Sequence, residues 1–282
     1  MDHFLDLPYV PAAHSRDRFH EFDIFIAPHQ SRKEPGLPPL ICFVHGGAWR
    51  SEDKGDHSDL ARRLAAHTGA PVAVPNYRLT TAANRLQHPA HAEDLLAFLH
   101  FMLDWAGPPG ASAPLYDPRQ VYLVGQSCGA HMIASVLLDS AAPSLAPAPA
   151  LLRAVQGVAL SEQISDVDAL LESFPDYRQW FIANTFGDLP SYADVNTAKM
   201  PRREGGLHTR WLIIHSTGDS LVDVRQSRLM YDHLRDAGDG GLAGGAVEKN
   251  WDELDGEHNE ILSSEKYARI VADFIHSKPT FS

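Results

Sequence analysis

Short apolar runs alternate with longer amphipathic stretches along most of the chain. Such an alternation predicts a mostly parallel β-sheet with helices on both faces, which is an α/β fold. The apolar runs are bounded by turn-forming residues, as strands usually are. The candidate strands are residues 21–27, 40–44, 72–75, 120–124, 155–160, 210–215 and 247–254.

Helical periodicity marks several of the connections between these runs. Residues 89–105 are the clearest case, because Pro89 suits a first turn and one face carries Leu95, Leu99, Met102 and Leu103. Further helices are expected at 130–138, 224–235 and 261–276. The remaining long connections are rich in Gly, Pro or Ala and read as loops, at 29–39, 141–150 and 238–245.

One connection is long enough to form a structure of its own. Residues 161–209 separate two predicted strands and contain two expected short helices, 167–174 and 177–186, both rich in aromatic residues. Ligands of an open parallel sheet bind at the carboxyl ends of its strands, where this insertion would emerge. We therefore expect one domain over residues 1–282 with a cap at 161–209. Packing of these aromatic side chains into the core is the alternative interpretation.

Composition excludes several classes of function. The chain has 282 residues, and 24 basic against 36 acidic residues give a net charge of −12, which argues against nucleic acid as a partner. No apolar run is long enough to span a membrane, and the first residues do not resemble a secretory signal. The two cysteines, Cys42 and Cys128, lie in an apolar run and a Gly-rich turn. A reducing compartment, and so a cytoplasmic location, is the expectation.

The strongest chemical signal is a G-x-S-x-G motif. It reads Gly125-Gln126-Ser127-Cys128-Gly129, and it joins a predicted strand directly to a predicted helix. This context is typical of a nucleophile elbow, a strained turn that exposes the serine while small residues let strand and helix approach. Ser127 is therefore the predicted nucleophile.

A serine hydroxyl needs a base to take its proton and an acid to hold that base. In chains with this elbow the acid follows the serine and the histidine comes last. Two carboxylates compete for the acid after the predicted strand 210–215. Asp219 lies in the loop just past the strand, whereas Asp223 precedes a helix with Gln226 three places on, which is a capping-box pattern. We predict Asp219 as the acid and Asp223 as a structural N-cap.

The chain contains 16 histidines, so position must decide which one is the base. His258 lies between the last predicted strand and the last predicted helix, where the third member of the triad belongs. His215 ends a strand and is expected to be buried and hydrogen-bonded. His88 and His91 could pair on a metal, but no third ligand has suitable spacing. No metal or cofactor is therefore expected.

An oxyanion-binding segment follows the predicted strand 40–44. It reads His45-Gly46-Gly47-Ala48-Trp49. Acyl transfer builds negative charge on the carbonyl oxygen, and pre-aimed backbone N–H groups stabilise that charge. Glycines let the backbone approach the substrate closely. The elbow would add the N–H of Cys128.

With these motifs in place, the sequence resembles the kynurenine formamidases (arylformamidases) of the α/β-hydrolase superfamily. The HGGAW segment, residues 76–79 (NYRL) and residues 170–177 (LLESFPDY) carry the resemblance, which runs from about residue 22 to 274. It implies an α/β-hydrolase fold, no cofactor, and oxyanion N–H groups on Gly47 and Ala48.

The resemblance also implies a substrate and a mechanism. Ser127 would attack the formyl carbon of N-formyl-L-kynurenine with His258 as base, releasing L-kynurenine and then formate within tryptophan catabolism. The predicted partner is a small aromatic formamide, and a homodimer stays compatible with the sequence. Residues that could face the aryl ring, with core packing as the alternative, are Trp49, Tyr177, Trp180 and Phe181.

Two other functions fit the same residues. A broad carboxylesterase would share every catalytic group, and only substrate ratios would separate it from a formamidase. A binding protein on an inactive hydrolase scaffold is a different class. Such proteins tend to lose the nucleophile or the base, and here Ser127, Asp219 and His258 are all present.

Overall fold

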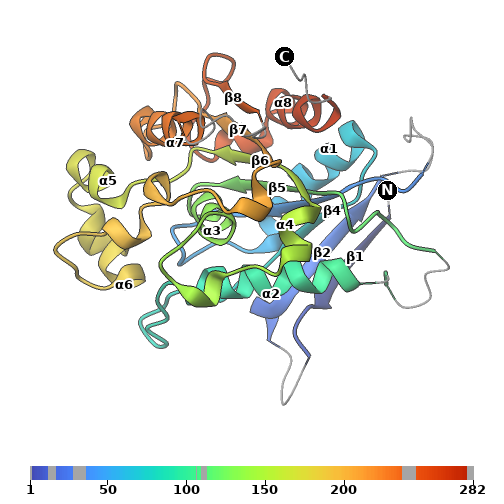
Figure 1. Ribbon diagram of the computed structural model, residues 1–282, viewed down its shortest axis with the longest axis horizontal. Coiled ribbons are helices and arrows are strands. Elements are labelled where there is room, and N and C mark those ends of the chain that lie inside the picture. The colour runs from blue at the N-terminus through green and yellow to red at the C-terminus, as the bar shows by residue number, and fades with distance from the viewer. Residues whose placement is uncertain are drawn as a thin grey trace.

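The computed structural model describes residues 2–11, 17–27, 36–105, 107–108, 113–236 and 246–277. These residues build one eight-stranded sheet, in the order β1-β2-β4-β3-β5-β6-β7-β8 (Figure 1). β2 is antiparallel to both its neighbours, and all other pairs are parallel. The strands are β1 (Asp2–Pro8), β2 (Glu21–Ile26), β3 (Leu40–Val44), β4 (Val72–Pro75), β5 (Val121–Gln126), β6 (Val155–Ser161), β7 (Arg210–Ile214) and β8 (Val247–Asn250).

All seven predicted strands are confirmed, and two differences concern the edges of the sheet. β8 ends at Asn250 rather than at 254. β1 was not predicted, because its side chains are mostly exposed and it carries no buried apolar run. An antiparallel edge strand of this kind gives a weak hydrophobic signal. The predicted loop at 238–245 and residues 29–35 of the loop at 29–39 lie outside the described residues.

The helices cover both faces of the sheet. They are α1 (Ser58–Thr68), α2 (Ala90–Asp104), α3 (Cys128–Leu137), α4 (Pro149–Ala154), α5 (Val167–Ser173), α6 (Ala183–Phe186), α7 (Val224–Asp236) and α8 (Glu265–His276). α1 was not predicted, although it buries Leu60, Ala61, Leu64 and Ala65 on one face. α4 begins inside the predicted loop 141–150, and α8 begins later than predicted, after a 3₁₀ turn at Glu260–Ser263.

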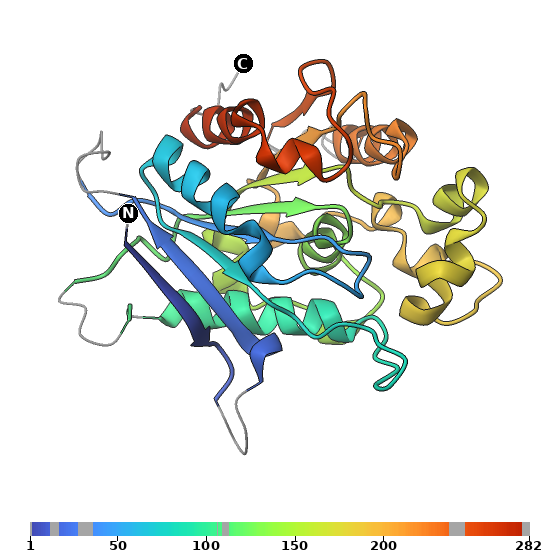
Figure 2. The same ribbon diagram turned by 180° about the vertical axis from the view of Figure 1, so that it is seen from behind.

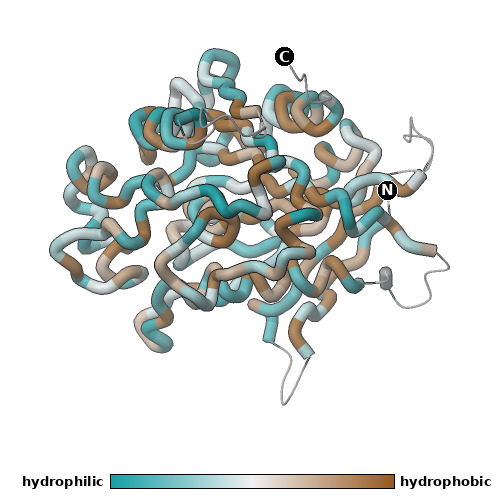
Figure 3. Tube along the Cα trace, in the orientation of Figure 1, coloured by the Kyte–Doolittle hydropathy of each residue, from teal (hydrophilic) through white to brown (hydrophobic). Residues whose placement is uncertain are grey.

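β3 shows how the sheet divides the core into two layers. Leu40, Cys42 and Val44 face one layer, to which α2 and α3 contribute. Ile41 and Phe43 face the other, to which α1 and α8 contribute (Figure 2). A strand buried on both faces is apolar throughout, which is why it reads as a continuous hydrophobic run. Hydrophobic residues concentrate along the central strands, and hydrophilic residues gather on outer turns (Figure 3).

The insertion 161–209 contains α5, a π-helical turn at Arg178–Ile182 and α6. It lies to one side of the sheet, past the carboxyl ends of the central parallel strands (Figure 1). Several of its apolar side chains join the core layer of α2 and α3, namely Leu170, Phe181, Ile182 and Phe186. Core packing therefore anchors this segment. Within the described residues, no helix has the length and apolarity needed to cross a membrane.

Candidate active site

Ser127 occupies the sharp turn between β5 and α3. Its backbone has φ 54° and ψ −121°, and α3 begins at the next residue. A non-glycine residue with positive φ is strained, as expected for a nucleophile elbow. Gly129 allows the close approach behind the turn, because a Cβ there would collide with the carbonyl oxygens of Val44 and His45. The turn thus holds the Ser127 hydroxyl at the carboxyl edge of the sheet.

Asp219 and His258 meet at the same edge, from the loops after β7 and β8. Oδ2 of Asp219 lies 2.8 Å from Nδ1 of His258. The other oxygen, Oδ1, accepts the N–H groups of Leu221 at 2.8 Å and Val222 at 3.0 Å. These bonds fix the carboxylate, so it can hold the imidazole in one tautomer with Nε2 free to act as a base.

Ser127 does not form a hydrogen bond with His258 in this structure, although both line one cavity. Catalytic hydrogen bonds often tighten only when a substrate is bound. The structure therefore brings the three predicted residues to one site, and their catalytic roles belong to the proposal below.

The predicted capping box at α7 is wrong. No hydrogen bond links the Asp223 carboxylate to the first turn, and its Oδ1 has no partner among the described residues. Gln226 points elsewhere, since its Oε1 accepts the N–H groups of Ser165 and Asp166, both at 2.8 Å. The tertiary contact with the loop after β6 outcompetes the local pattern. His215 is buried, as predicted, and its Nδ1 lies 3.0 Å from Oγ of Ser227.

The HGGAW segment forms a tight left-handed turn after β3. Gly47, Ala48 and Trp49 have φ values of 91°, 52° and 58°. Only glycine fits at Gly47, because a Cβ there would collide with the carbonyl oxygen of Ser51. Among the described residues, the N–H groups of Gly47 and Cys128 have no acceptor. They are two of the three groups expected to face an oxyanion, and Cys128 opens α3, where N–H groups are free. The third, the N–H of Ala48, approaches the Cys128 sulphur instead.

The Cys128 side chain supports this turn from behind. Its sulphur accepts the N–H of Trp49 at 3.2 Å, and the N–H of Ala48 also approaches it. Burial raises the pKa of Cys128 to about 12, so the group remains a thiol at neutral pH. Tyr77 adds a bond from its hydroxyl to the carbonyl oxygen of Gly46, at 2.7 Å.

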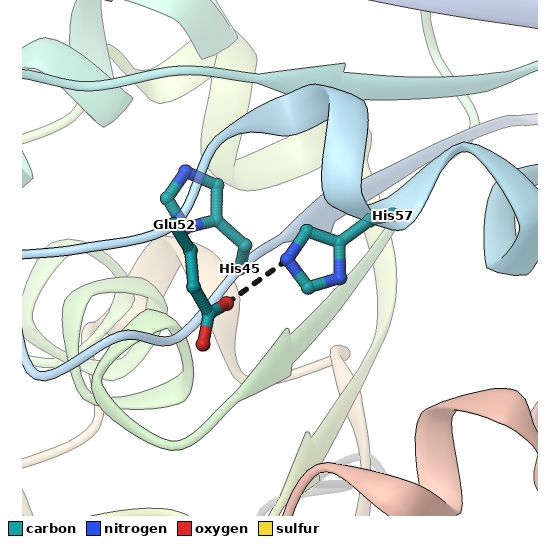
Figure 4. Close-up of side chains that lie close together, drawn as sticks. All are labelled: His45, Glu52 and His57. Atoms are coloured by element: carbon teal, nitrogen blue, oxygen red, sulfur yellow. Dashed lines mark hydrogen bonds and ion pairs between the residues drawn. The ribbon is translucent and has the colours of Figure 1, made fainter.

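A second group of polar side chains lies behind the same turn: His45, Glu52 and His57 (Figure 4). Oε2 of Glu52 lies 3.0 Å from Nε2 of His57, and the His45 ring stacks between Tyr77 and His57. Burial, and then His57, lower the pKa of His45 to about 4, so this ring is neutral. The hydrogen bond to His57 helps to hold the Glu52 carboxylate ionised, with its pKa below the usual range despite burial.

A cavity of about 350 Å³ opens in front of Ser127. Besides Ser127 and His258 it is lined by Gly47, Ala48 and three aromatic residues of the insertion, Tyr177, Trp180 and Phe181. The Tyr177 hydroxyl donates to the carbonyl oxygen of Leu221 at 2.9 Å, which ties the insertion to the Asp219 loop. A larger cavity, of about 520 Å³, shares Arg50 and Phe181 but has no residue of the predicted triad.

Trp49 does not line the cavity, contrary to one of the two predicted interpretations. Its side chain is fully buried and packs edge-on against His131 and Phe186. His131 in turn lies 2.9 Å from the carbonyl oxygen of Val195, so this cluster anchors the insertion to α3. The tight turn points the indole into the core, where its Nε1 has no hydrogen-bond partner among the described residues.

The sequence interpretation missed three charged residues of the site. Arg50 and Glu52 line the cavity, and Glu162 follows β6 beside the Asp219–His258 pair. The available signal for Glu162 was its place, directly after the mostly buried strand β6, at the carboxyl edge of the sheet. Its proximity to Asp219 depends on strand order, which a single sequence does not reveal.

Comparison with known proteins agrees with this architecture. A family model described as the α/β-hydrolase fold matches residues 41–239, and the chain therefore belongs to this family of hydrolases. The kynurenine formamidase of Meyerozyma guilliermondii is 28% identical over 86% of this chain and 87% of its own length. With further fungal relatives of the same name, it confirms the resemblance to kynurenine formamidases of the fungal type.

Esterases are also among the related proteins. A probable isoprenylcysteine α-carbonyl methylesterase of Oryza sativa subsp. japonica is 28% identical over 72% of this chain, which spans only 48% of that protein. A truncated carbohydrate esterase from gut microbiota superposes with a TM-score of 0.70 at 17% identity, over 98% of this chain and 95% of that one. The last likeness shows the fold alone.

Proposed function

We propose that this protein hydrolyses N-formyl-L-kynurenine to L-kynurenine and formate. The observation that carries the proposal is the meeting of Ser127, the Asp219–His258 pair and the HGGAW turn around one cavity. The choice of substrate rests on the similarity to the fungal kynurenine formamidases. The cavity of about 350 Å³ lies at the small end of the range for ligand sites, which suits a single amino-acid derivative.

The proposed reaction has two steps. His258 takes the Ser127 proton as the oxygen attacks the formyl carbon, and the N–H groups of Gly47 and Cys128 hold the oxyanion. His258 then gives its proton to the departing aryl nitrogen, which leaves as an arylamine. Water, activated by His258, attacks the formyl-serine ester and releases formate, which restores Ser127.

The charges in the cavity favour a formamidase over a general esterase. Arg50 and Glu52 both line it, so one cation and one anion are available to a ligand. Both side chains are held in place by hydrogen bonds. The Arg50 guanidinium donates to the carbonyl oxygen of Trp180 at 2.6 Å, and the Glu52 carboxylate lies 3.0 Å from Nε2 of His57. N-formyl-L-kynurenine carries an α-carboxylate and an α-ammonium group. We propose that Arg50 binds the former and Glu52 the latter.

If Arg50 and Glu52 bind the amino-acid end, their substitution should lower kcat/KM only for substrates that have this end. In Arg50→Gln and Glu52→Gln, kcat/KM for N-formyl-L-kynurenine should fall about 10-fold or more, mainly through KM, because each removes one partner of a charge pair. Formanilide has the aryl formamide without the amino-acid end, so its kcat/KM should stay within about twofold. Steady-state kinetics on both substrates check this, with Glu172→Gln, a charge outside the cavity, as the matched control. Equal losses on both substrates would exclude the assignment.

A carboxylesterase is the second candidate, since the plant methylesterases are as similar in sequence as the formamidases. It uses the same triad and oxyanion groups. An esterase would favour an uncharged ester over the zwitterionic formamide, and the ratio of the two rates separates the candidates.

A further inference from the structure

Glu162 is a buried carboxyl group that the proposed mechanism does not use. Glu162 is fully buried. Its backbone has φ 48°, which is a strained conformation for a residue other than glycine. It follows β6, between the elbow after β5 and the Asp219 loop after β7. Strain and an isolated buried acid are both costly, and they persist where the surroundings enforce them.

The groups facing Glu162 are mostly polar or negative. Its Oε2 lies 3.8 Å from Nδ1 of His258, and its Oε1 accepts the N–H of Ser216 at 3.2 Å. The Asp219 carboxylate and the Tyr267 hydroxyl on α8 are the other titratable groups that interact with it. Among the described residues, no lysine or arginine forms an ion pair with Glu162, and His258 would compensate a full negative charge there only when its imidazole is protonated.

Two oxygen atoms beside this carboxyl group have no donor within the described part of the chain. They are Oε2 of Glu162 and Oε1 of Gln126, and the two side chains lie within hydrogen-bonding reach of each other. A carboxylate and an amide oxygen both only accept, so an ionised Glu162 would leave both atoms unsatisfied. With the amide turned round, Nε2 of Gln126 could donate to Glu162, but it would lose its bonds to the carbonyl oxygen of His258, at 3.3 Å, and to Oδ1 of Asn259, at 3.4 Å.

One proton satisfies both oxygen atoms. We propose that Glu162 is a protonated positioning residue, whose O–H donates to Oε1 of Gln126 and thereby ties the elbow to the His258 loop. The chain of bonds runs from Glu162 through the Gln126 amide to the backbone of His258. Because Glu162 is neutral, it does not compete with Asp219 for the imidazole N–H. This inference rests on the proposed roles of Asp219 and His258, not on the substrate.

Electrostatics points in the same direction. Burial, and then the neighbouring Asp219, raise the pKa of Glu162 to about 9, against about 4.3 in an unfolded chain, and they outweigh the contacts with Ser216 and Gln126, which lower it. The folded state therefore binds this proton more tightly than the unfolded state. The resulting stability is fully present below about pH 4 and is lost as the pH rises towards 9. Glu162→Gln removes this dependence, so its Tm advantage over wild type should grow between pH 5 and 9.

Infrared difference spectroscopy tests the protonation without any turnover. Wild type at pH 7 should show the C=O stretching band of a protonated carboxyl group, which is absent in Glu162→Gln and titrates away from wild type near pH 9. Glu253→Gln, an exposed acid outside the site, should leave the band unchanged. Absence of the band from wild type at pH 7 would overturn the proposal, even if the Gln variant failed to fold.

A pH profile tests the positioning role, with an aryl ester as substrate. Since glutamine is neutral like a protonated glutamate, Glu162→Gln should retain kcat/KM within about 3-fold at pH 7.5. The apparent pKa of the acid limb of its kcat/KM profile should lie within about 0.3 pH units of the wild-type value. Glu162→Met cannot bond to Gln126 and should lose about 10-fold in kcat at unchanged KM. An acid limb that moves down by a unit in Glu162→Gln would mean that Glu162 is an anion, and would contradict the proposal. A complete lack of turnover by wild type would instead count against the proposed function.

Discussion

Ser127→Ala should lower kcat at least ~10⁴-fold and leave Tm nearly unchanged. The change removes the attacking oxygen, while alanine fits the same positive-φ turn as serine does. Kinetics on an aryl ester and a thermal melt measure the two effects. A serine-directed sulfonyl fluoride should label Ser127 in wild type and nothing in the variant. Ser191→Ala, an exposed serine of the insertion outside the cavity, is the control. Activity within tenfold of wild type in Ser127→Ala would end the assignment.

Asp219→Asn should lower kcat by about 10³- to 10⁴-fold, because an amide no longer holds the imidazole in its working tautomer. The bonds from Leu221 and Val222 to the side-chain oxygen can persist in the variant, so the loop should keep its shape. Kinetics and a thermal melt of the purified variant check this.

Asp223→Asn is the matched control for that experiment. Asp223 makes no capping bond and does not line the cavity, so kcat should stay within about twofold and Tm should hardly move. A severe loss in Asp223→Asn with a mild one in Asp219→Asn would show that the wrong carboxylate had been chosen.

The sequence predicts best what is encoded locally. The elbow is readable because strand, turn and helix lie within one short stretch around Ser127. The order of serine, acid and histidine then limits the search to the loops after two predicted strands, which is how Asp219 and His258 could be placed. The central strands were found for a similar reason, since burial on both faces makes them predominantly apolar.

What the sequence could not provide depends on tertiary contacts. The capping box failed because Gln226 bonds to Ser165 and Asp166, residues far away along the chain. Trp49 adjoins the oxyanion turn in sequence, yet the direction of that turn buries its ring. Glu162 acquires its environment only because β6 lies between β5 and β7 in the sheet. In each case a neighbour in space outweighs the neighbours in sequence.

The most direct test of the account is the acyl and substrate preference of the wild-type enzyme. kcat/KM should be measured for N-formyl-L-kynurenine, its N-acetyl analogue and an aryl butyrate. We expect the formyl substrate to exceed the acetyl analogue by at least ~100-fold, or ~2.7 kcal/mol in transition-state binding, after comparison with the uncatalysed ratio. Equal turnover of formyl and acetyl substrates, with the aryl butyrate faster still, would contradict the account and indicate a general esterase.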